Sequence, residues 1–159
     1  MTPALSDREK ITNYETLTHI TQVRKLLSKI LVELLHRAEA HDATKLAPPE
    51  LPVFVAYTPK LATTAYDSPA YRQCLQEMRP ALEHHYAANR HHPEHFPNGI
   101  NDMTLLDLIE MLCDWQAAVL RHQDGNLNAS IERSQARFGI SAQLAAILRN
   151  TAQFLEERS

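Results

Sequence analysis

The sequence predicts an all-α fold, arranged as a single-domain bundle of five to six helices. Apolar residues recur at steps of three and four along most of the chain, which is the spacing of one helix face. The 159 residues include only three glycines, too few for the turns of an all-β or doubly wound fold. The composition, 44% hydrophobic and 22% charged, is ordinary for a soluble globular protein. We expect one domain over residues 1–159, with a core at about 16–121 and C-terminal helices at about 127–156.

The first predicted helix begins near Ser6 or Thr16 and ends near Ala40. No Gly or Pro interrupts this segment, and Lys and Arg lie between its apolar residues, on the expected solvent side. The following segment, His41–Leu61, contains four prolines. Proline disrupts helix interiors, so this segment is predicted to be mostly turns, with one short helix at Thr44–Leu46.

A second long helix is predicted to begin at Ser68-Pro69, because serine is a favoured N-cap and proline is favoured at the first helical position. It should end at His91 or His92, since Pro93 disfavours helical geometry in the residue before it. One face of this helix changes from apolar to polar along its length; its residues are Leu75, Met78, Leu82, His85, Asn89 and His92. Such a stripe predicts a buried site rather than a solvated surface.

The third long helix is predicted from Met103 to about His122, with Asp102 as its cap. It is apolar on most sides, which is typical of a helix at the centre of its domain. Two further helices, Leu127–Phe138 and Ser141–Glu156, are expected to be joined at Gly139.

Charge and composition exclude several classes of partner. The net charge of −3 gives no general attraction to nucleic acid or to an anionic membrane. No apolar run has the length of a membrane span, and Met1–Lys10 lacks the apolar stretch of a signal peptide. Cys74 and Cys113 are isolated and predict two reduced thiols in the core. We therefore expect a cytoplasmic protein with no nucleic-acid and no membrane partner.

Five of the nine histidines fall within the twelve residues 84–95. Histidine is a common metal ligand and titrates near neutral pH. His85 and His92 could be core residues satisfied by hydrogen bonds, with the others on the surface. Two imidazoles on one face with Asn89 between them favour a bound metal or phosphate, because each buried polar group without a partner costs about 1–3 kcal/mol.

The adjacent pair His41-Asp42 could place an imidazole and a carboxylate on one ion from a single rigid segment. Taken alone, the pair more simply predicts Asp42 as the N-cap of the short helix, with His41 on the surface. On the central helix, Asp107, Glu110 and Asp114 share one face. They could form a solvated stripe, but no Lys or Arg stands four residues after any of them. A metal ion would offset the repulsion between these carboxylates.

Together these features resemble the HD-domain superfamily, an all-α set of metal-dependent phosphohydrolases. The resemblance rests on His41-Asp42 with Lys45, on the histidine-rich middle helix and on Asp114. It covers about residues 16–121, and the string is similar to a family of short, mostly uncharacterised HD-like proteins of bacteria and their phages. The stretch 91–94 also resembles the His-His-Glu of a subgroup with two-metal sites.

The resemblance implies a role for each matching residue. The metal ligands would be His41, Asp42, His85, His92 and Asp114, and the substrate would contact Asn89 and His91. Lys45 would neutralise charge on the phosphate or on a leaving oxygen, and Glu94 or Glu110 would position the attacking water. The ion would lower the pKa of that water.

The first histidine of the superfamily pattern would correspond to His19. A continuous helix would hold His19 about 33 Å from His41, so we do not include it among the ligands. His36 lies nearer in sequence and stays open as an alternative.

The sequence therefore predicts a metal-dependent phosphohydrolase that acts on a nucleotide or a related small phosphate ester. One or two divalent transition-metal ions (Mn, Fe, Co, Ni or Zn) suit an imidazole-rich site. One alternative is a non-catalytic metal- or nucleotide-binding helical module. Another is a carboxylate-rich, Mg-dependent all-α nucleotide pyrophosphohydrolase, which would leave the histidines unexplained, and a third is an HD-like di-iron oxygenase. The expected partner is a small-molecule phosphate substrate, with homo-oligomer formation left open.

Overall fold

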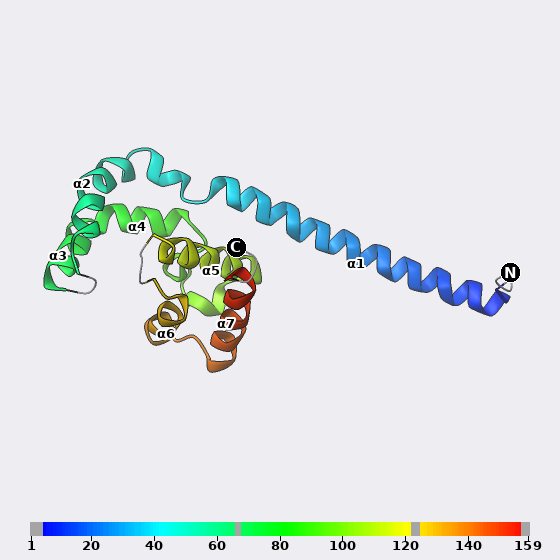
Figure 1. The fold of residues 1–159 in the computed structure, drawn as a ribbon. Coiled ribbons are helices and arrows are strands. Elements are labelled where there is room, and N and C mark those ends of the chain that lie inside the picture. Colours follow the sequence, from blue (N-terminus) through cyan, green and yellow to red (C-terminus); the bar gives the residue numbers. More distant parts are fainter. Residues whose placement is uncertain (1–4, 66–67, 122–124, 157–159) are drawn as a thin grey trace. The chain divides into compact units, whose positions relative to one another are not determined.

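The computed structural model describes residues 5–65, 68–121 and 125–156, which form seven α-helices and three short 3₁₀ helices and contain no strand (Figure 1). The predicted all-α class is confirmed, with more helices than the five or six expected. The chain divides into two compact units, Met1–Glu39 and Ala40–Ser159. No helix of the described part combines the length and apolarity that crossing a membrane requires.

The first helix, α1 (Asp7–Ala40), matches the prediction. Its start is fixed by Ser6 and Glu9. The Ser6 hydroxyl accepts from the Glu9 backbone N–H at 3.4 Å, and the Glu9 carboxylate accepts from the Ser6 backbone N–H at 2.7 Å. This reciprocal pair satisfies two backbone donors that the helix leaves open. α1 provides nearly all of the described structure of the first unit.

The expectation of mostly turns in residues 41–61 is wrong. The short helix predicted at 44–46 is confirmed as η1 (Ala43–Leu46), but it is followed by a regular helix, α2 (Glu50–Ala62). Pro49 precedes α2 and Pro52 lies in its first turn, where backbone N–H groups have no intrahelical acceptor, so neither removes a hydrogen bond. Pro59 lies inside the helix, near its C-terminal end.

The helix predicted from residue 68 to 91 or 92 is two helices, α3 (Pro69–Glu77) and α4 (Arg79–Ala88), which meet at Met78. The break falls where Pro80, within the first turn of α4, can donate no backbone hydrogen bond to the preceding turn. The predicted cap is confirmed, since the Ser68 hydroxyl accepts from the Tyr71 backbone N–H at 3.2 Å.

The end of α4 also differs from the prediction. Asn89 is already extended, with φ −116° and ψ 112°, and two short helices follow, η2 (Pro93–His95) and η3 (Gly99–Asp102). His91 and His92 therefore lie on an irregular segment and not on a helix face.

The central helix is α5 (Leu105–Val119), which begins after Thr104 rather than after the predicted Asp102. The Thr104 hydroxyl accepts from the Asp107 backbone N–H, and the Asp107 carboxylate accepts from the Thr104 backbone N–H at 2.7 Å. Asp102 instead accepts hydrogen bonds from Asn98.

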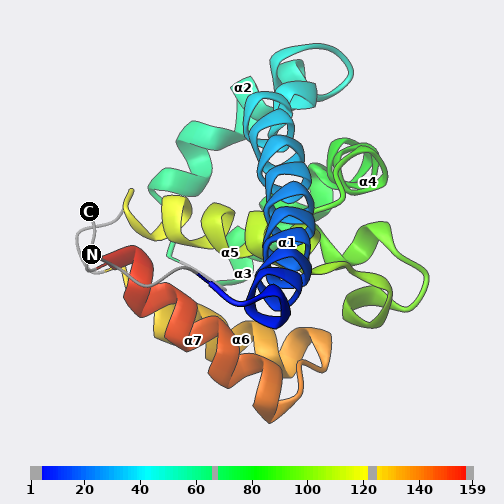
Figure 2. The same cartoon turned by 90° about the vertical axis from the view of Figure 1, so that its right-hand side faces the viewer.

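The C-terminal helices α6 (Leu127–Phe138) and α7 (Ala142–Glu156) match the prediction and lie side by side in Figure 2. Gly139 ends α6 with φ 65°, a left-handed conformation that suits glycine. These helices pack with α5 around one apolar core, so α5 is central as expected. The buried residues of this core are Leu108, Met111, Leu112, Leu127, Ile131, Ile140, Ala145, Leu148 and Ala152.

Candidate metal centre

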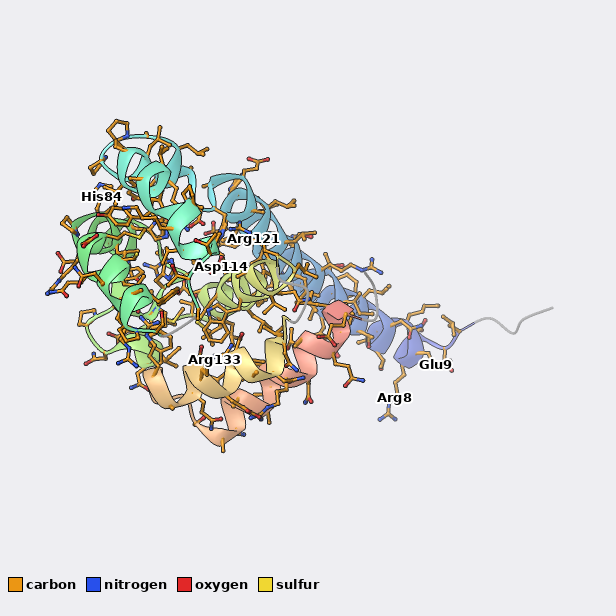
Figure 3. All side chains as sticks on the ribbon, turned by 60° about the vertical axis from the view of Figure 1, so that its left-hand side comes forward. Arg8, Glu9, His84, Asp114, Arg121 and Arg133 are labelled. Atoms are coloured by element: carbon orange, nitrogen blue, oxygen red, sulfur yellow. The ribbon has the colours of Figure 1, made fainter. Side chains whose placement is uncertain are left out.

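Four segments of the second unit supply the polar side chains of the candidate site. They are the turn that leads into η1, the start of α2, the stretch from the end of α4 to η2, and one face of α5. The helices η1, α2 and α4 pack against one another, which brings the first three segments together. Figure 3 labels His84 on α4 and Asp114 on α5, two of the helices concerned.

Asp42 enters the site through an unusual backbone conformation. Its φ of 57° and ψ of 10° lie in the left-handed region, which aspartate tolerates better than most residues. Asp42 occupies the N-cap position of η1, yet its side chain makes no capping hydrogen bond. Its Oδ2 accepts from Lys45 Nζ at 2.5 Å instead. The alternative in which Asp42 serves only as a helix cap therefore finds no support.

The innermost donors are Asp42, His85, His91 and His92, which we call the imidazole cluster. Each offers one ligand atom, and these four atoms lie within 4.8 Å of one another. Asp42 Oδ1 lies 3.2 Å from His85 Nε2 and 3.6 Å from His91 Nε2, and His85 Nε2 lies 2.9 Å from His92 Nε2. His85 and His91 are 1% and 2% exposed, so solvent reaches neither ring.

Two atoms of the imidazole cluster are buried with no hydrogen-bond partner among the described residues. They are Asp42 Oδ1 and His91 Nε2. A buried polar atom left in this state costs about 1–3 kcal/mol. A carboxylate oxygen and an imidazole nitrogen that face each other can both be satisfied by a cation between them.

Electrostatics favour the neutral form of the His91 and His92 rings. Burial, together with the neighbouring imidazoles His91 and His85, lowers the pKa of His92 to about 3. Burial and His41 also lower the pKa of His91. Burial opposes ionisation of Asp42, but contacts with His85 and Lys45 hold the pKa of its carboxyl well below the usual range. Neutral imidazoles beside an ionised carboxylate are the protonation states that metal ligation requires.

A second set of contacts, the His41 group, contains His41, Glu110 and Asp114. His41 Nδ1 lies 3.0 Å from Glu110 Oε1, and His41 Nε2 lies 3.6 Å from Asp114 Oδ1. Asp114 contributes most to a rise in the pKa of His41 to about 9, burial opposes it, and Glu110 adds to it. Burial raises the pKa of Asp114, but His41 more than offsets this and lowers it. A protonated His41 thus satisfies both carboxylates without a metal.

The two sets overlap. His91 Nδ1 lies 3.2 Å from Glu110 Oε1, so His91 joins the imidazole cluster to the His41 group. His41, His91 and Glu110 form a second candidate ligand set, and His41, Asp42 and Asp114 form a third. The imidazole cluster is the better first metal site, because the pKa values of His91 and His92 are lowered, whereas that of His41 is raised to about 9.

The structure brings together most of the residues predicted to act. All five predicted ligands belong to the three overlapping ligand sets. His91, predicted to contact substrate, lies among the candidate ligands. Asn89 is buried beside the cluster and donates to Thr44 Oγ1 at 3.0 Å, and Lys45 contacts Asp42.

Two predicted residues lie elsewhere. Glu94 accepts from Arg137 on α6 at 2.7 Å and belongs to none of the ligand sets. Asp107 accepts from Arg90 at 3.1 and 3.2 Å and caps α5, so the row of α5 carboxylates does not present a common magnesium site. His19 and His36 lie on α1, in the first unit.

Glu50 is a polar residue of the site that the sequence did not predict. It is fully buried and accepts from His84 Nδ1 at 2.7 Å and from His85 Nδ1 at 2.9 Å. Burial alone would raise the pKa of Glu50, but hydrogen bonds from His84, Thr44 and His85 hold it below its ordinary value. A single glutamate in a proline-rich segment carries no spacing signal that could have revealed this role.

One known protein family matches nearly the whole chain. The model of DUF5662, described as a family of unknown function, matches residues 8–157. The chain belongs to the DUF5662 family. No curated protein and no solved structure shows a significant match. Membership in DUF5662 does not itself connect the chain to the HD-domain superfamily, which stays a prediction from the motifs. The chain thus combines an all-α fold with a buried cluster of histidines and carboxylates that could bind metal.

Proposed function

We propose that this protein binds a divalent transition-metal ion in the imidazole cluster and uses it to hydrolyse a small phosphate ester. One observation supports the metal proposal most directly: Asp42 Oδ1 and His91 Nε2 are buried, lie 3.6 Å apart and find no hydrogen-bond partner within residues 5–65, 68–121 and 125–156. The lowered pKa of His92 also supports a metal site, because it keeps the His92 ring neutral and able to act as a ligand.

The donor chemistry selects the ion. Three imidazole nitrogens and one carboxylate oxygen suit Mn, Fe, Co, Ni or Zn, whereas Mg and Ca prefer sites made of oxygen. A second ion at the His41 group would have to displace the proton on His41. We therefore propose that one ion binds first in the imidazole cluster and that a second binds more weakly.

Hydrolysis is proposed from the charges around the cluster. A bound ion would polarise a phosphoryl oxygen and lower the pKa of a water. Lys45 is half-buried beside Asp42 and places a positive charge where it can neutralise phosphate. The water oxygen forms a bond to phosphorus as the ester P–O bond breaks. Protonated His41, held by Glu110 and Asp114, gives its proton to the leaving oxygen and regains one from the attacking water.

The substrate class is carried by the resemblance to HD-domain phosphohydrolases, which makes a nucleotide or a related small ester the first choice. No partner beyond this substrate is part of the proposal. Nucleic acid and membrane binding are not expected, and homo-oligomer formation stays open.

A second candidate is a structural metal site without catalysis. Four protein ligands from a buried cluster leave no open position in a tetrahedral ion, which is typical of structural zinc. The burial of His85 and His91 favours this alternative.

Metal content separates the proposals from a plain polar network. The protein is purified without chelator, and bound metals are measured by mass spectrometry for the unaltered chain, for Asp42→Asn and for Asp7→Asn as a control on α1. We expect about one ion per chain, at least a tenfold weaker binding in Asp42→Asn, and no change in the control. Equal binding by all three proteins, or binding by none, would overturn the metal site.

Turnover separates the enzyme from the structural site. Mononucleotides and simple phosphate monoesters are assayed with Mn²⁺ and Co²⁺. Metal-dependent phosphate release that is lost in Asp42→Asn supports hydrolysis. Stoichiometric metal binding with no turnover on the panel would favour the structural alternative.

A further inference from the structure

Glu50 is a buried carboxylate that accepts hydrogen bonds from two imidazoles. It is the first residue of α2, and it reaches the adjacent histidines His84 and His85 near the end of α4. His84, labelled in Figure 3, has an exposed side chain, whereas His85 is 1% exposed and belongs to the imidazole cluster. Glu50 itself is in none of the candidate ligand sets.

The hydrogen-bond partners of His85 Nδ1 determine which nitrogen of the ring carries the proton. An ionised carboxylate can only accept hydrogen bonds, so the 2.9 Å contact with Glu50 Oε2 needs the proton on His85 Nδ1. Asn89 Nδ2 and Thr44 Oγ1 also lie 3.0 and 3.3 Å from His85 Nδ1. The two hydrogens of Asn89 Nδ2, however, are used by Thr44 Oγ1 at 3.0 Å and by the His85 carbonyl oxygen at 2.8 Å, and the Thr44 hydroxyl hydrogen bonds to Glu50.

This assignment leaves the lone pair of a neutral His85 on Nε2. That atom faces Asp42 Oδ1 at 3.2 Å and His92 Nε2 at 2.9 Å, which is the interior of the imidazole cluster. The tautomer that bonds Glu50 is therefore the one that presents a ligand atom to the proposed ion.

We propose that Glu50 is a positioning residue that holds His85 in its Nε2-ligand tautomer and orients the ring toward the metal site. This inference rests on the proposed metal site. A carboxylate that accepts from the far nitrogen of a ligating histidine fixes the ring orientation and increases its basicity as a ligand. Loss of such a partner weakens metal binding by roughly 10- to 100-fold.

Glu50→Gln tests this role with little change in side-chain shape. Its amide nitrogen can donate to His85 Nδ1, which moves the proton of the ring to Nε2 and blocks the ligand atom. We expect Co²⁺ affinity, followed through its visible absorption, to fall by roughly 10- to 100-fold. Glu50→Asp keeps the charge and should recover part of that loss.

His84→Gln is the matched control, because it removes the other imidazole on Glu50 without touching a ligand. Its Co²⁺ affinity should stay within about threefold of the unaltered protein. An equal loss in His84→Gln and Glu50→Gln would overturn the proposal and indicate that Glu50 only holds α2 against α4.

The tautomer can be measured without any metal. Long-range ¹H–¹⁵N NMR of the metal-free, unaltered protein should show the His85 proton on Nδ1 and an acceptor at Nε2. A proton on Nε2 would overturn the proposal even if Glu50→Gln failed to fold. Because this measurement needs no bound ion, failure of the metal site itself would be seen separately, as absence of Co²⁺ binding to the unaltered chain.

Discussion

Asp42 Oδ1 and His91 Nε2 lie 3.6 Å apart, one from the turn before η1 and the other from the segment after α4, and neither has a hydrogen-bond partner in the part of the chain that the structure describes. Two residues 49 positions apart in the sequence thus place a carboxylate oxygen and an imidazole nitrogen where both could bind one cation. Binding of a cation there should stabilise the folded chain, since the unfolded chain cannot assemble the four ligands.

Thermal unfolding measures that stabilisation. At a free Co²⁺ concentration about 100 times the dissociation constant, the folded state gains about 2.7 kcal/mol. For a chain of this size the melting temperature should rise by about 5–10 °C. His91→Gln should lose most of this rise, and His19→Gln on α1 should keep it. A rise of the same size in His91→Gln would count against the imidazole cluster as the site.

The elevated pKa of His41 predicts a pH dependence for the metal-free protein. His41 binds its proton more tightly in the folded state, with a pKa of about 9, than at its ordinary value of 6.5. Its contribution to stability is therefore complete below about pH 6.5 and is lost as pH rises through about 9. Urea unfolding with chelator between pH 6.5 and 9.5 should show this decline, and His41→Gln should show less of it. Parallel curves would contradict the ion pairs assigned to His41.

His92 predicts the opposite slope at lower pH. Its pKa falls from 6.5 to about 3 on folding, so below pH 6.5 the unfolded chain binds a proton that the folded chain does not. The metal-free protein should lose stability as pH falls from about 6.5 toward 4.5, and His92→Gln should be less sensitive over this range. The range stays above the ordinary pKa of aspartate, which limits the influence of Asp42 and Asp114 on the comparison.

Glu94 and Glu110 should behave differently when each is changed to glutamine. Glu94 pairs with an exposed Arg137, and such surface pairs contribute at most about 1 kcal/mol. We expect Glu94→Gln to leave Co²⁺ affinity and any phosphatase activity within about twofold. Glu110→Gln should change both, because Glu110 contacts His41 and His91. A greater loss in Glu94→Gln would restore the role that the sequence predicted for Glu94.

The helix ends that the sequence predicts best are those that carry clear capping signals. Ser68 and Gly139 mark ends of α3 and α6 where expected, because capping depends on a few neighbouring residues. Prolines were harder to interpret. Pro49 before α2 and Pro52 in its first turn permit a helix, whereas Pro80 accompanies the break between α3 and α4. Their effect depends on position relative to a helix start, which the sequence alone does not fix.

Some residues of the candidate site are predictable from local motifs, and others depend on the tertiary fold. The pair His41-Asp42 and the later Asp114 were identifiable from their motif. The predicted helix face of His85, Asn89 and His92 does not include His91, and the resemblance gives His91 a substrate contact instead of a ligand role. The chain leaves helical geometry at Asn89, and both His91 and His92 turn inward. Glu50 depends on the packing of α2 against α4, a tertiary contact without a local signal.

The left-handed backbone at Asp42 narrows which side chains this position accepts. Glycine, asparagine and aspartate adopt that conformation readily, whereas other L-residues pay about 1–2 kcal/mol. Of the three, aspartate alone brings a negative charge. Asparagine is therefore the informative replacement, since it preserves the bend of the chain while it removes the anion. Alanine or glutamate would disturb backbone and ligand together, and a loss of function in either could not be traced to one cause.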